Sequence, residues 1–361
     1  MNRDLRQNPG ETAIARVAEA AAGFRRGVPV TIRDGAGASA ALAVETASDE
    51  AINALPGEAL LVLSHARART LKMRLYTKDV VAMKLEKGVR AGALRAIADP
   101  TADLSEPLKG PFDAVREALP ARFAAAVKLA KLAGLLPAVV VPRDGEVEGA
   151  FEISADDIVN YDDEVARTLT LVTRAHVPLE GAERAELAAF RAGDGGPEHY
   201  AIVINAPPTD QPVLTRLHSE CFTGDLLGSL KCDCGAQLRG AIEAIEKAGG
   251  GVLLYLAQEG RGIGLINKLR AYRLQDQGFD TMEANERLGF EADERLYGIA
   301  AKMLNLLGYK SVRLLTNNPE KLAALEAAGV KVVERVAHSF PDNEHNRAYL
   351  RTKAEKGGHL L

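Results

Sequence analysis

Three cysteines in one short segment are the residues best suited to chemistry. Cys221 is followed after ten intervening residues by Cys232, and Cys234 comes two positions later. Zinc prefers tetrahedral sulfur and nitrogen ligands, and a site with three protein ligands leaves a fourth position where a water becomes a nucleophile. The spacing is therefore compatible with a catalytic zinc site but does not by itself establish one. Two alternatives stay open: a structural zinc site completed by His218, and reduced buried cysteines.

The segment before the cysteines shares one feature with the zinc-dependent nucleobase deaminases. His218 and Glu220 reproduce their H-x-E motif. The matching P-C-x-x-C is missing, so the sequence excludes that family while allowing zinc chemistry on a heterocycle.

A glycine-rich turn further along the chain is suited to binding phosphate. Glu259, Gly260 and Arg261 lie between a predicted strand and a predicted helix, where backbone N–H groups and a guanidinium can meet phosphate oxygens. Gly262 and Gly264 allow close approach of the backbone. The alternative is that the loop only turns the chain. No G-x-x-x-x-G-K-[ST] motif occurs, which excludes a P-loop nucleotidase.

Two further groups combine charge with a predicted helix start. Thr316 ends a predicted strand and Lys321 enters a helix, a place that suits an anion, although an Asn-Asn-Pro turn that caps the helix is the alternative. Asp293 and Arg295 lie near another predicted helix start, where charged residues also favour the helix dipole. Residues two apart do not face each other on a helix, so spacing cannot pair them.

Composition limits the classes of function. The chain has 361 residues, of which 47% are hydrophobic, enough for two medium cores. Its net charge of -4 provides no general attraction to nucleic acid or anionic lipid, so any phosphate binding must be local. No signal peptide or membrane-spanning run is recognisable, which predicts a cytoplasmic protein whose cysteines stay reduced.

Hydrophobic periodicity predicts two domains of mixed α and β structure, each a layered sheet with packed helices. Polar residues between 155 and 196 place the boundary near Asp163, giving domains 1–163 and 164–361. The first half is predicted to contain helices over 12–24, 112–119 and 121–132 and strands over 28–32 and 138–141. The second is predicted to contain helices over 236–247, 265–277, 293–307 and 320–328 and strands over 200–206, 212–218, 251–257, 311–316 and 330–336.

Five ordered motifs in the second half resemble the GTP cyclohydrolase II family. They read RLHSECFTGDLLGSLKCDCGAQL, YLAQEGRGIGLINKLRAYRLQDQGFDTMEAN, LGFEADERLYG, RLLTNNPEKL and TKAEKGGHLL, and the resemblance covers about 168–361. By resemblance the zinc ligands are Cys221, Cys232 and Cys234. The matching GTP-binding positions are Arg216, Leu217, His218, Ser219, Glu220, Gln237, Glu259, Gly260, Arg261, Thr281, Thr316 and Lys321.

The same resemblance implies the catalytic residues and the reaction. Tyr272 matches an active-site tyrosine, Arg295 the proposed nucleophile toward the α-phosphate, and Asp293 its proton acceptor. Because a guanidinium rarely loses its proton, electrostatic stabilisation by Arg295 is the alternative. The implied reaction is zinc-dependent hydrolysis of GTP to 2,5-diamino-6-(5-phosphoribosylamino)pyrimidin-4-one, formate and pyrophosphate, the first step of riboflavin biosynthesis. Magnesium accompanies the triphosphate, and the family suggests a homodimer.

The first half resembles dihydroxybutanone phosphate synthase in FRRGVPVTIRDG and AVKLAKLAGLLPAVVV. That family's acidic cluster is replaced by DGAGASAALAVETAS, in which Asp34 is the only early acid, and its Gly-His-Thr-Glu segment is absent near 121–126. Because such an enzyme needs clustered carboxylates to hold magnesium, we expect an inactive domain kept for stability, assembly or regulation. A bifunctional enzyme and a non-catalytic nucleotide-binding zinc protein are the alternatives.

Overall fold

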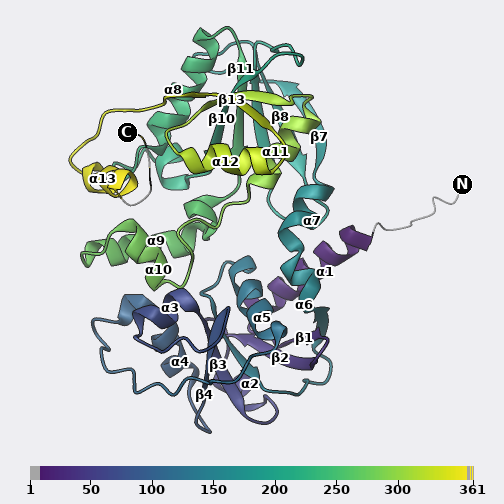
Figure 1. Cartoon of the computed structure of the whole chain (residues 1–361), viewed down its shortest axis with the longest axis vertical. Coiled ribbons are helices and arrows are strands. Elements are labelled where there is room, and N and C mark those ends of the chain that lie inside the picture. The colour runs from purple at the N-terminus through teal and green to yellow at the C-terminus, as the bar shows by residue number, and fades with distance from the viewer. Residues whose placement is uncertain (1–8, 356–357, 359, 361) are drawn as a thin grey trace, which may run out of the picture. The chain divides into compact units, whose positions relative to one another are not determined.

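The computed structural model describes residues 9–355, 358 and 360, and these form two compact units (Figure 1). The first unit holds the described residues up to Asp162 together with Ile266–Glu294, and the second holds Asp163–Leu265 and the described residues from Arg295 onward. Each unit contains a mixed β-sheet with packed helices, which confirms the predicted fold class. No helix in the described part of the chain is long and apolar enough to span a membrane.

A six-stranded sheet of order β4-β3-β5-β2-β1-β6 forms the centre of the first unit. Only β1 and β6 pair in parallel; the other neighbours are antiparallel. The strands are β1 (Val30–Asp34), β2 (Gly37–Ala43), β3 (Ala59–Ser64), β4 (Val80–Lys84), β5 (Ala138–Pro142) and β6 (Phe151–Ser154). The helices are α1 (Pro9–Arg25), α2 (Asp49–Asn53), α3 (His65–Thr70), α4 (Ala91–Ala98), α5 (Ala121–Leu132) and α6 (Ala155–Val159).

Two of these helices form the core of the first unit against its sheet. Phe24 of α1 and Phe123 and Leu129 of α5 are almost completely buried in one cluster with the β-branched and aliphatic residues of the strands. Burying an aromatic or leucine side chain contributes about 1.5 to 3 kcal/mol, so this cluster supplies much of the stability of the unit. Helix α5 has the bounds predicted from its periodicity.

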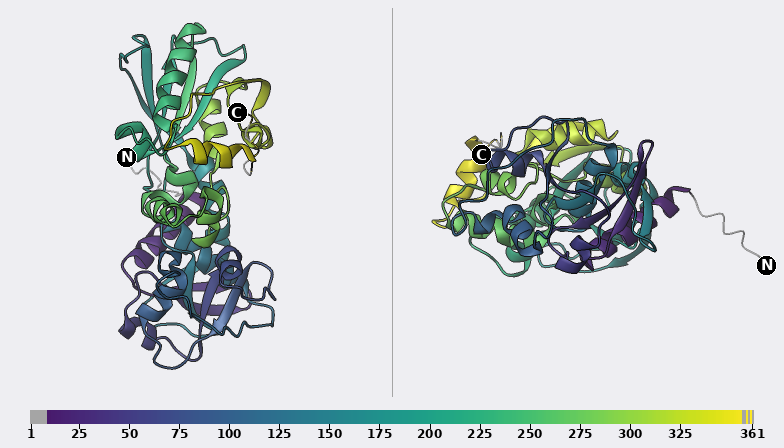
Figure 2. Two further views of the ribbon diagram at one scale, coloured as in Figure 1. Left: turned by 90° about the vertical axis from the view of Figure 1, so that its left-hand side faces the viewer. Right: turned by 90° about the horizontal axis from the view of Figure 1, so that it is seen from below.

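A segment from the second half of the sequence also belongs to the first unit. Helices α9 (Gly264–Asp276) and α10 (Thr281–Arg287) contain most of it, and α10 packs beside α3. Both views of Figure 2 carry this pair in green. The guanidinium of Arg270 pairs with Glu45 at 2.7 Å, and the amide of Asn267 donates to the carbonyl of Gly134 at 3.1 Å. The chain therefore passes between the units near residues 162, 265 and 294, whereas the sequence pattern indicated one passage.

A seven-stranded sheet of order β13-β12-β10-β11-β9-β8-β7 forms the second unit. Strands β13, β12, β10 and β11 are parallel, while β9, β8 and β7 continue the sheet antiparallel. The strands are β7 (Thr170–His176), β8 (Ala185–Arg191), β9 (His199–Ile204), β10 (Val213–Ser219), β11 (Gly251–Leu256), β12 (Ser311–Leu315) and β13 (Lys331–Val336). The helices are α7 (Tyr161–Thr168), which begins before the unit, α8 (Cys234–Lys247), α11 (Tyr297–Leu306), α12 (Pro319–Ala327) and α13 (Arg347–Glu355).

Two predicted helices differ in the structure. Residues 112–119 form no helix; Ala114 bridges to Met83 and the amide of Val115 donates to the carbonyl of Ala82 at 2.8 Å, so pairing with the edge strand β4 replaces the helix. The helix predicted over 293–307 starts only at Tyr297. Leu296 before it is extended, and its carbonyl accepts a hydrogen bond from the Gln258 side chain at 3.0 Å.

A buried guanidinium ties the β1–β2 turn of the first unit to α5. The side chain of Arg122 is 2% exposed and pairs with Asp34 at 3.0 Å and with Asp144 at 2.7 Å. It also donates to the hydroxyl of Ser39 at 2.8 Å, and its backbone amide donates to Asp34 at 2.9 Å. Removing one partner of such a pair leaves a buried charge poorly compensated.

We predict that Asp34→Asn destabilises the protein at neutral pH and has less effect in acid. Burial tends to raise the pKa of Asp34, but hydrogen bonds from Arg122 and Ala36 and the charge of Arg122 outweigh it, so the pKa lies below its ordinary value. The carboxylate therefore stabilises the fold fully above its unfolded pKa of about 3.9, and this contribution is lost as pH falls through the lower folded value.

Urea unfolding of the wild type and the variant at pH 7 and pH 3 measures the effect. We expect a loss of about 1 to 3 kcal/mol at pH 7 that shrinks at pH 3. Asp79→Asn is the control, because Asp79 is exposed and forms no ion pair with any described residue. Equal stability of wild type and Asp34→Asn at pH 7 would contradict the prediction.

Candidate functional site

The predicted site residues of the second unit gather at one edge of its sheet. Strands β10, β11 and β12 are parallel, so their carboxyl ends meet at the same edge. Glu220 and Cys221 follow β10, Glu259 to Arg261 follow β11, and Thr316 to Lys321 follow β12. Loops at the carboxyl ends of parallel strands are the usual location of ligand sites in α/β sheets.

The three cysteine sulfurs converge at this edge. All three Sγ atoms lie within 4.8 Å of one another, and those of Cys221 and Cys232 are 3.8 Å apart. The thiol of Cys221 is buried, while the other two are half-buried. Cys221 follows β10 directly, Cys234 begins α8, and the loop between them brings Cys232 back. The arrangement could hold a metal ion with three sulfur ligands.

Gly224 allows this convergence because its missing side chain leaves room for the sulfurs. A Cβ at this position would lie 2.8 Å from Sγ of Cys232 and 3.0 Å from Sγ of Cys221. A Cβ at Gly235 would meet the carbonyl oxygen of Gly224 at 2.3 Å. The loop and the start of α8 are therefore packed around the sulfurs so closely that neither glycine tolerates a substituent without movement.

His218 does not complete the sulfur cluster as a fourth ligand. Among the described residues only the three cysteines form the cluster. The Nε2 atom of His218 instead lies 3.0 Å from both carboxylate oxygens of Asp225. Its Nδ1 atom is buried and has no hydrogen-bond partner in the described part of the chain. Burial is the main cause of a lowered His218 pKa. His218 is therefore engaged with Asp225 and not with the sulfurs.

Asp225 connects three elements around the first cysteine. Its carboxylate contacts His218 of β10, accepts the backbone N–H of Cys221 at 3.0 Å and accepts the hydroxyl of Tyr255 from β11 at 3.1 Å. The sequence analysis missed Asp225 and Tyr255. The available signal was the acid four residues after Cys221, within the short π-helical turn Phe222–Leu226.

A second buried network contains Arg216 and Gln237. The guanidinium of Arg216 donates to the carbonyl of Leu315 at 2.9 Å and to the side chain of Gln237, which in turn donates to Asp233. Burial lowers the pKa of Arg216 to about 10, and the positive charge of Arg295 acts in the same direction. The buried Arg216 therefore lies within the electrostatic influence of the half-buried Arg295.

The glycine-rich turn after β11 has a strained backbone. Gly260 and Arg261 both have φ of 63°, and left-handed backbone is costly for an arginine. The carboxylate of Glu259 accepts the N–H of Phe222 at 2.6 Å, which links this turn to the loop of the cysteines. Gly260 also donates its N–H to the Glu259 side chain at 3.0 Å.

The loop after β12 confirms the helix-capping alternative. Asn318 caps α12 through the N–H of Glu320 at 3.0 Å, and its own N–H donates to the hydroxyl of Thr316 at 3.0 Å. Lys321 is 7% exposed and donates to the carbonyl of Leu217 at 3.1 Å. Asn318 therefore caps α12 while the buried ammonium group of Lys321 stays at the same sheet edge.

The remaining predicted residues are divided between the two units. The side chain of Leu217 is 1% exposed, and its carbonyl already accepts the hydrogen bond from Lys321. Tyr272, Thr281 and Asp293 belong to the first unit, whereas Arg295 opens the last part of the second. The part of these four residues in the site stays a prediction.

The chain is similar to several proteins of known name. A family model described as GTP cyclohydrolase II matches residues 170–337. The GTP cyclohydrolase-2 of Azospirillum brasilense is 51% identical over 97% of this chain and 95% of its own length. The riboflavin biosynthesis protein RibBA is 48% identical in Synechocystis and 47% in Bacillus cereus, each over 66% of this chain. The chain spans 46% and 64% of those two relatives, less than two thirds of either.

We predict that Gly224→Ala prevents the three sulfurs from binding one metal ion. The added methyl group would lie 2.8 Å from Sγ of Cys232 and 2.9 Å from Cβ of Cys234. Contacts this short cannot persist, so the cysteine loop is displaced. Metal content per chain, measured by elemental mass spectrometry after purification, should fall at least several-fold. Gly92→Ala is the matched control, because a Cβ there meets nothing within 4 Å. Full metal content in Gly224→Ala would contradict the prediction.

Proposed function

The chain belongs to the GTP cyclohydrolase II family, and from this premise we propose that Cys221, Cys232 and Cys234 hold the zinc ion with which the enzyme opens the guanine ring of GTP. The products are 2,5-diamino-6-(5-phosphoribosylamino)pyrimidin-4-one, formate and pyrophosphate, in the first step of riboflavin biosynthesis. The convergence of three sulfurs without a fourth described ligand carries the proposal.

The donor set fits a catalytic zinc ion. Three thiolates suit zinc, and bound zinc supplies a Lewis acid that activates water for hydrolysis. The chain positions these ligands through Asp225, which binds the N–H of Cys221, and through Glu259, which binds the N–H of Phe222. Both contacts fix the part of the loop that carries Cys221 and Phe222.

Cations at the same sheet edge support binding of a triphosphate. Arg216 and Lys321 are buried, and Arg216 lies within the electrostatic influence of Arg295. Arg261 sits on a turn whose glycines permit close approach of the backbone. Phosphate dianions match guanidinium geometry, and magnesium bound to the triphosphate offsets its remaining charge. By family resemblance we assign the other predicted GTP positions, which are Leu217, His218, Ser219, Glu220, Gln237, Glu259, Gly260, Thr281 and Thr316.

We assign Arg295 a stabilising role on physical grounds. A guanidinium keeps its proton far above neutral pH, so a neutral nucleophilic form is scarce. A fixed positive charge beside the α-phosphate instead stabilises the charge that develops as pyrophosphate leaves. Asp293 as proton acceptor and Tyr272 in proton transfer at the guanine ring follow from the family resemblance.

We expect Cys232→Ser to abolish formate release from GTP. The loss of one thiolate ligand weakens zinc binding, and hydrolysis of the guanine ring needs the metal. Formate and pyrophosphate should be measured separately in the same reaction, together with zinc content. The purified wild type should release both products.

Two further variants divide the roles within this assay. Tyr272→Phe should slow formate release while zinc stays bound, and Arg295→Lys, which keeps the charge, should retain more pyrophosphate release than Arg295→Ala. A wild-type protein that binds zinc and GTP but releases neither product would favour the non-catalytic alternative. Unchanged turnover in Tyr272→Phe would remove that residue from the proposal.

We also propose that the first unit has no synthase activity. Asp34, the only early acid of the segment that resembles dihydroxybutanone phosphate synthase, is already paired with Arg122. A carboxylate held by a buried guanidinium is unavailable to bind magnesium or to accept a proton.

The purified protein should therefore leave ribulose 5-phosphate unchanged in the presence of magnesium, as followed by formate release and by the consumption of the sugar phosphate. Conversion above the rate of a protein-free control would establish the bifunctional alternative. The family resemblance further predicts a homodimer, which the molar mass in solution tests.

A further inference from the structure

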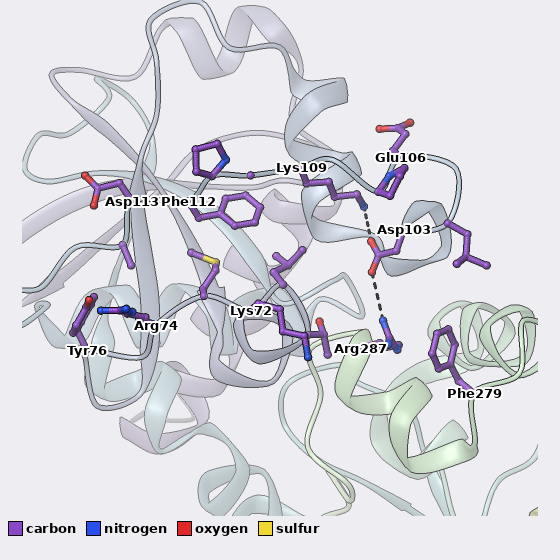
Figure 3. A pocket seen from close by; sticks show the side chains of 18 of the residues that line it. Lys72, Arg74, Tyr76, Asp103, Glu106, Lys109, Phe112, Asp113, Phe279 and Arg287 are labelled. Carbon is purple, nitrogen blue, oxygen red and sulfur yellow. Dashed lines mark hydrogen bonds and ion pairs between the residues drawn. The ribbon is translucent and has the colours of Figure 1, made fainter.

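The first unit contains a cavity that the proposed cyclohydrolase reaction does not use. Its volume is about 720 Å³, within the range of small-molecule sites. Two loops of the first unit, residues 70–76 and 103–116, form most of the wall, and Phe279 and Arg287 from the α10 region complete it (Figure 3). All lining residues belong to the first unit, so the cavity exists within one compact body.

The charge of this cavity is opposite to that of the chain. Basic side chains outnumber acidic ones in its lining, although the whole chain has a net charge of -4. The basic residues are Lys72, Arg74, Lys109, Arg116 and Arg287, and the acidic residues are Asp103, Glu106 and Asp113. A cavity that concentrates positive charge attracts anions from solution.

One of these acids is shared among several cations. Asp103 pairs with the fully buried Arg67 at 2.8 Å, with Lys109, and with Arg287 at 3.8 Å. Figure 3 shows the contacts of Asp103 with Lys109 and Arg287. One carboxylate cannot neutralise three cations, so this wall of the cavity keeps a positive charge. The side chain of Lys109 is only 7% exposed, and its ammonium also donates to the carbonyl of Ala96.

Three other cations of the lining lack an acidic partner. Lys72, Arg74 and Arg116 form no ion pair with any residue between 9 and 355, and the guanidinium of Arg116 lies 5.3 Å from the centre of the Tyr76 ring. The side chains of Lys72, Arg74 and Arg116 can therefore donate hydrogen bonds to a ligand in the cavity.

We propose that this cavity binds a small molecule that carries a phosphate group. Guanidinium and ammonium groups of the lining can bind a phosphate dianion. Glu106 and Asp113 can accept hydrogen bonds from hydroxyl groups of an attached organic part, and Tyr76, Phe112 and Phe279 offer apolar surface. The site gives the first unit a binding role that does not depend on the cyclohydrolase reaction.

A tryptophan reporter tests the proposal without interference from the GTP site. The chain contains no tryptophan, so Tyr76→Trp places the only indole in the cavity wall. Tyr76 is 42% exposed, so the larger ring has room. Indole fluorescence is titrated with pyrophosphate, inorganic phosphate and ribose 5-phosphate, and with ribose and chloride at matched ionic strength as controls. The reference variant is Phe151→Trp. The ring of Phe151 also lies near an arginine, Arg16, but Phe151 does not line the cavity.

We expect a saturable fluorescence change in Tyr76→Trp with at least one phosphate-bearing probe, and none in Phe151→Trp. Saturation by ribose 5-phosphate identifies a phosphate ester, and saturation by pyrophosphate or phosphate alone identifies an inorganic ligand. Arg74→Gln should weaken binding about tenfold, the effect of 1.4 kcal/mol, while Lys78→Gln, an exposed lysine nearby that does not line the cavity, should not.

No saturation with any probe, an equal response to chloride, or unchanged binding in Arg74→Gln would overturn the proposal. If the reporter variant does not fold, calorimetry on the chain without tryptophan compares the phosphate affinity of Arg74→Gln with that of Lys78→Gln. The proposed GTP site is the same in both variants, so a difference in affinity belongs to the cavity. Neither measurement involves GTP hydrolysis, so its failure leaves the proposed function untouched.

Discussion

The convergence of three sulfurs on one point is the constraint on which the functional edge depends. The cysteines are far enough apart in sequence that the loop between β10 and α8 must return on itself to bring Cys221, Cys232 and Cys234 within 4.8 Å. Gly224 provides the space, and Asp225 fixes the direction in which the chain leaves β10. Because Asp225 also binds Tyr255 of β11, the position of the sulfurs is tied to the parallel strands themselves. The geometry of the sulfur cluster therefore depends on the geometry of the sheet.

The edge combines two chemistries in loops that share contacts. Glu259, in the turn predicted to bind phosphate, accepts the N–H of Phe222 in the cysteine loop. Arg216 reaches from β10 to the carbonyl of Leu315, at the end of β12. A movement of any one loop therefore disturbs the others, which suits an enzyme that must hold a base and a triphosphate at the same time.

The sequence predicted most of the second unit because its strands and helices alternate with clear periods. It also identified the loops that follow β10, β11 and β12. It could not identify Asp225 and Tyr255, since a single acid and a single tyrosine carry no periodic signal. The helix expected over 112–119 was wrong because pairing of Ala114 with Met83 of β4 depends on a contact distant in sequence. The start of α11 moved to Tyr297 because Gln258, also distant in sequence, binds the carbonyl of Leu296.

The repeated passage of the chain between the units limits how this protein could be shortened. Helices α9 and α10 are encoded within the second half, yet Arg270 pairs with Glu45 and Lys131 pairs with Glu294. A cut near residue 163 would separate each of these charges from its partner. Gly289, whose backbone approaches Ser64 and Pro137, would also be lost from the first fragment. The two units are therefore interdependent as pieces of polypeptide, because the first half of the sequence lacks Ile266–Glu294, the segment that completes its unit.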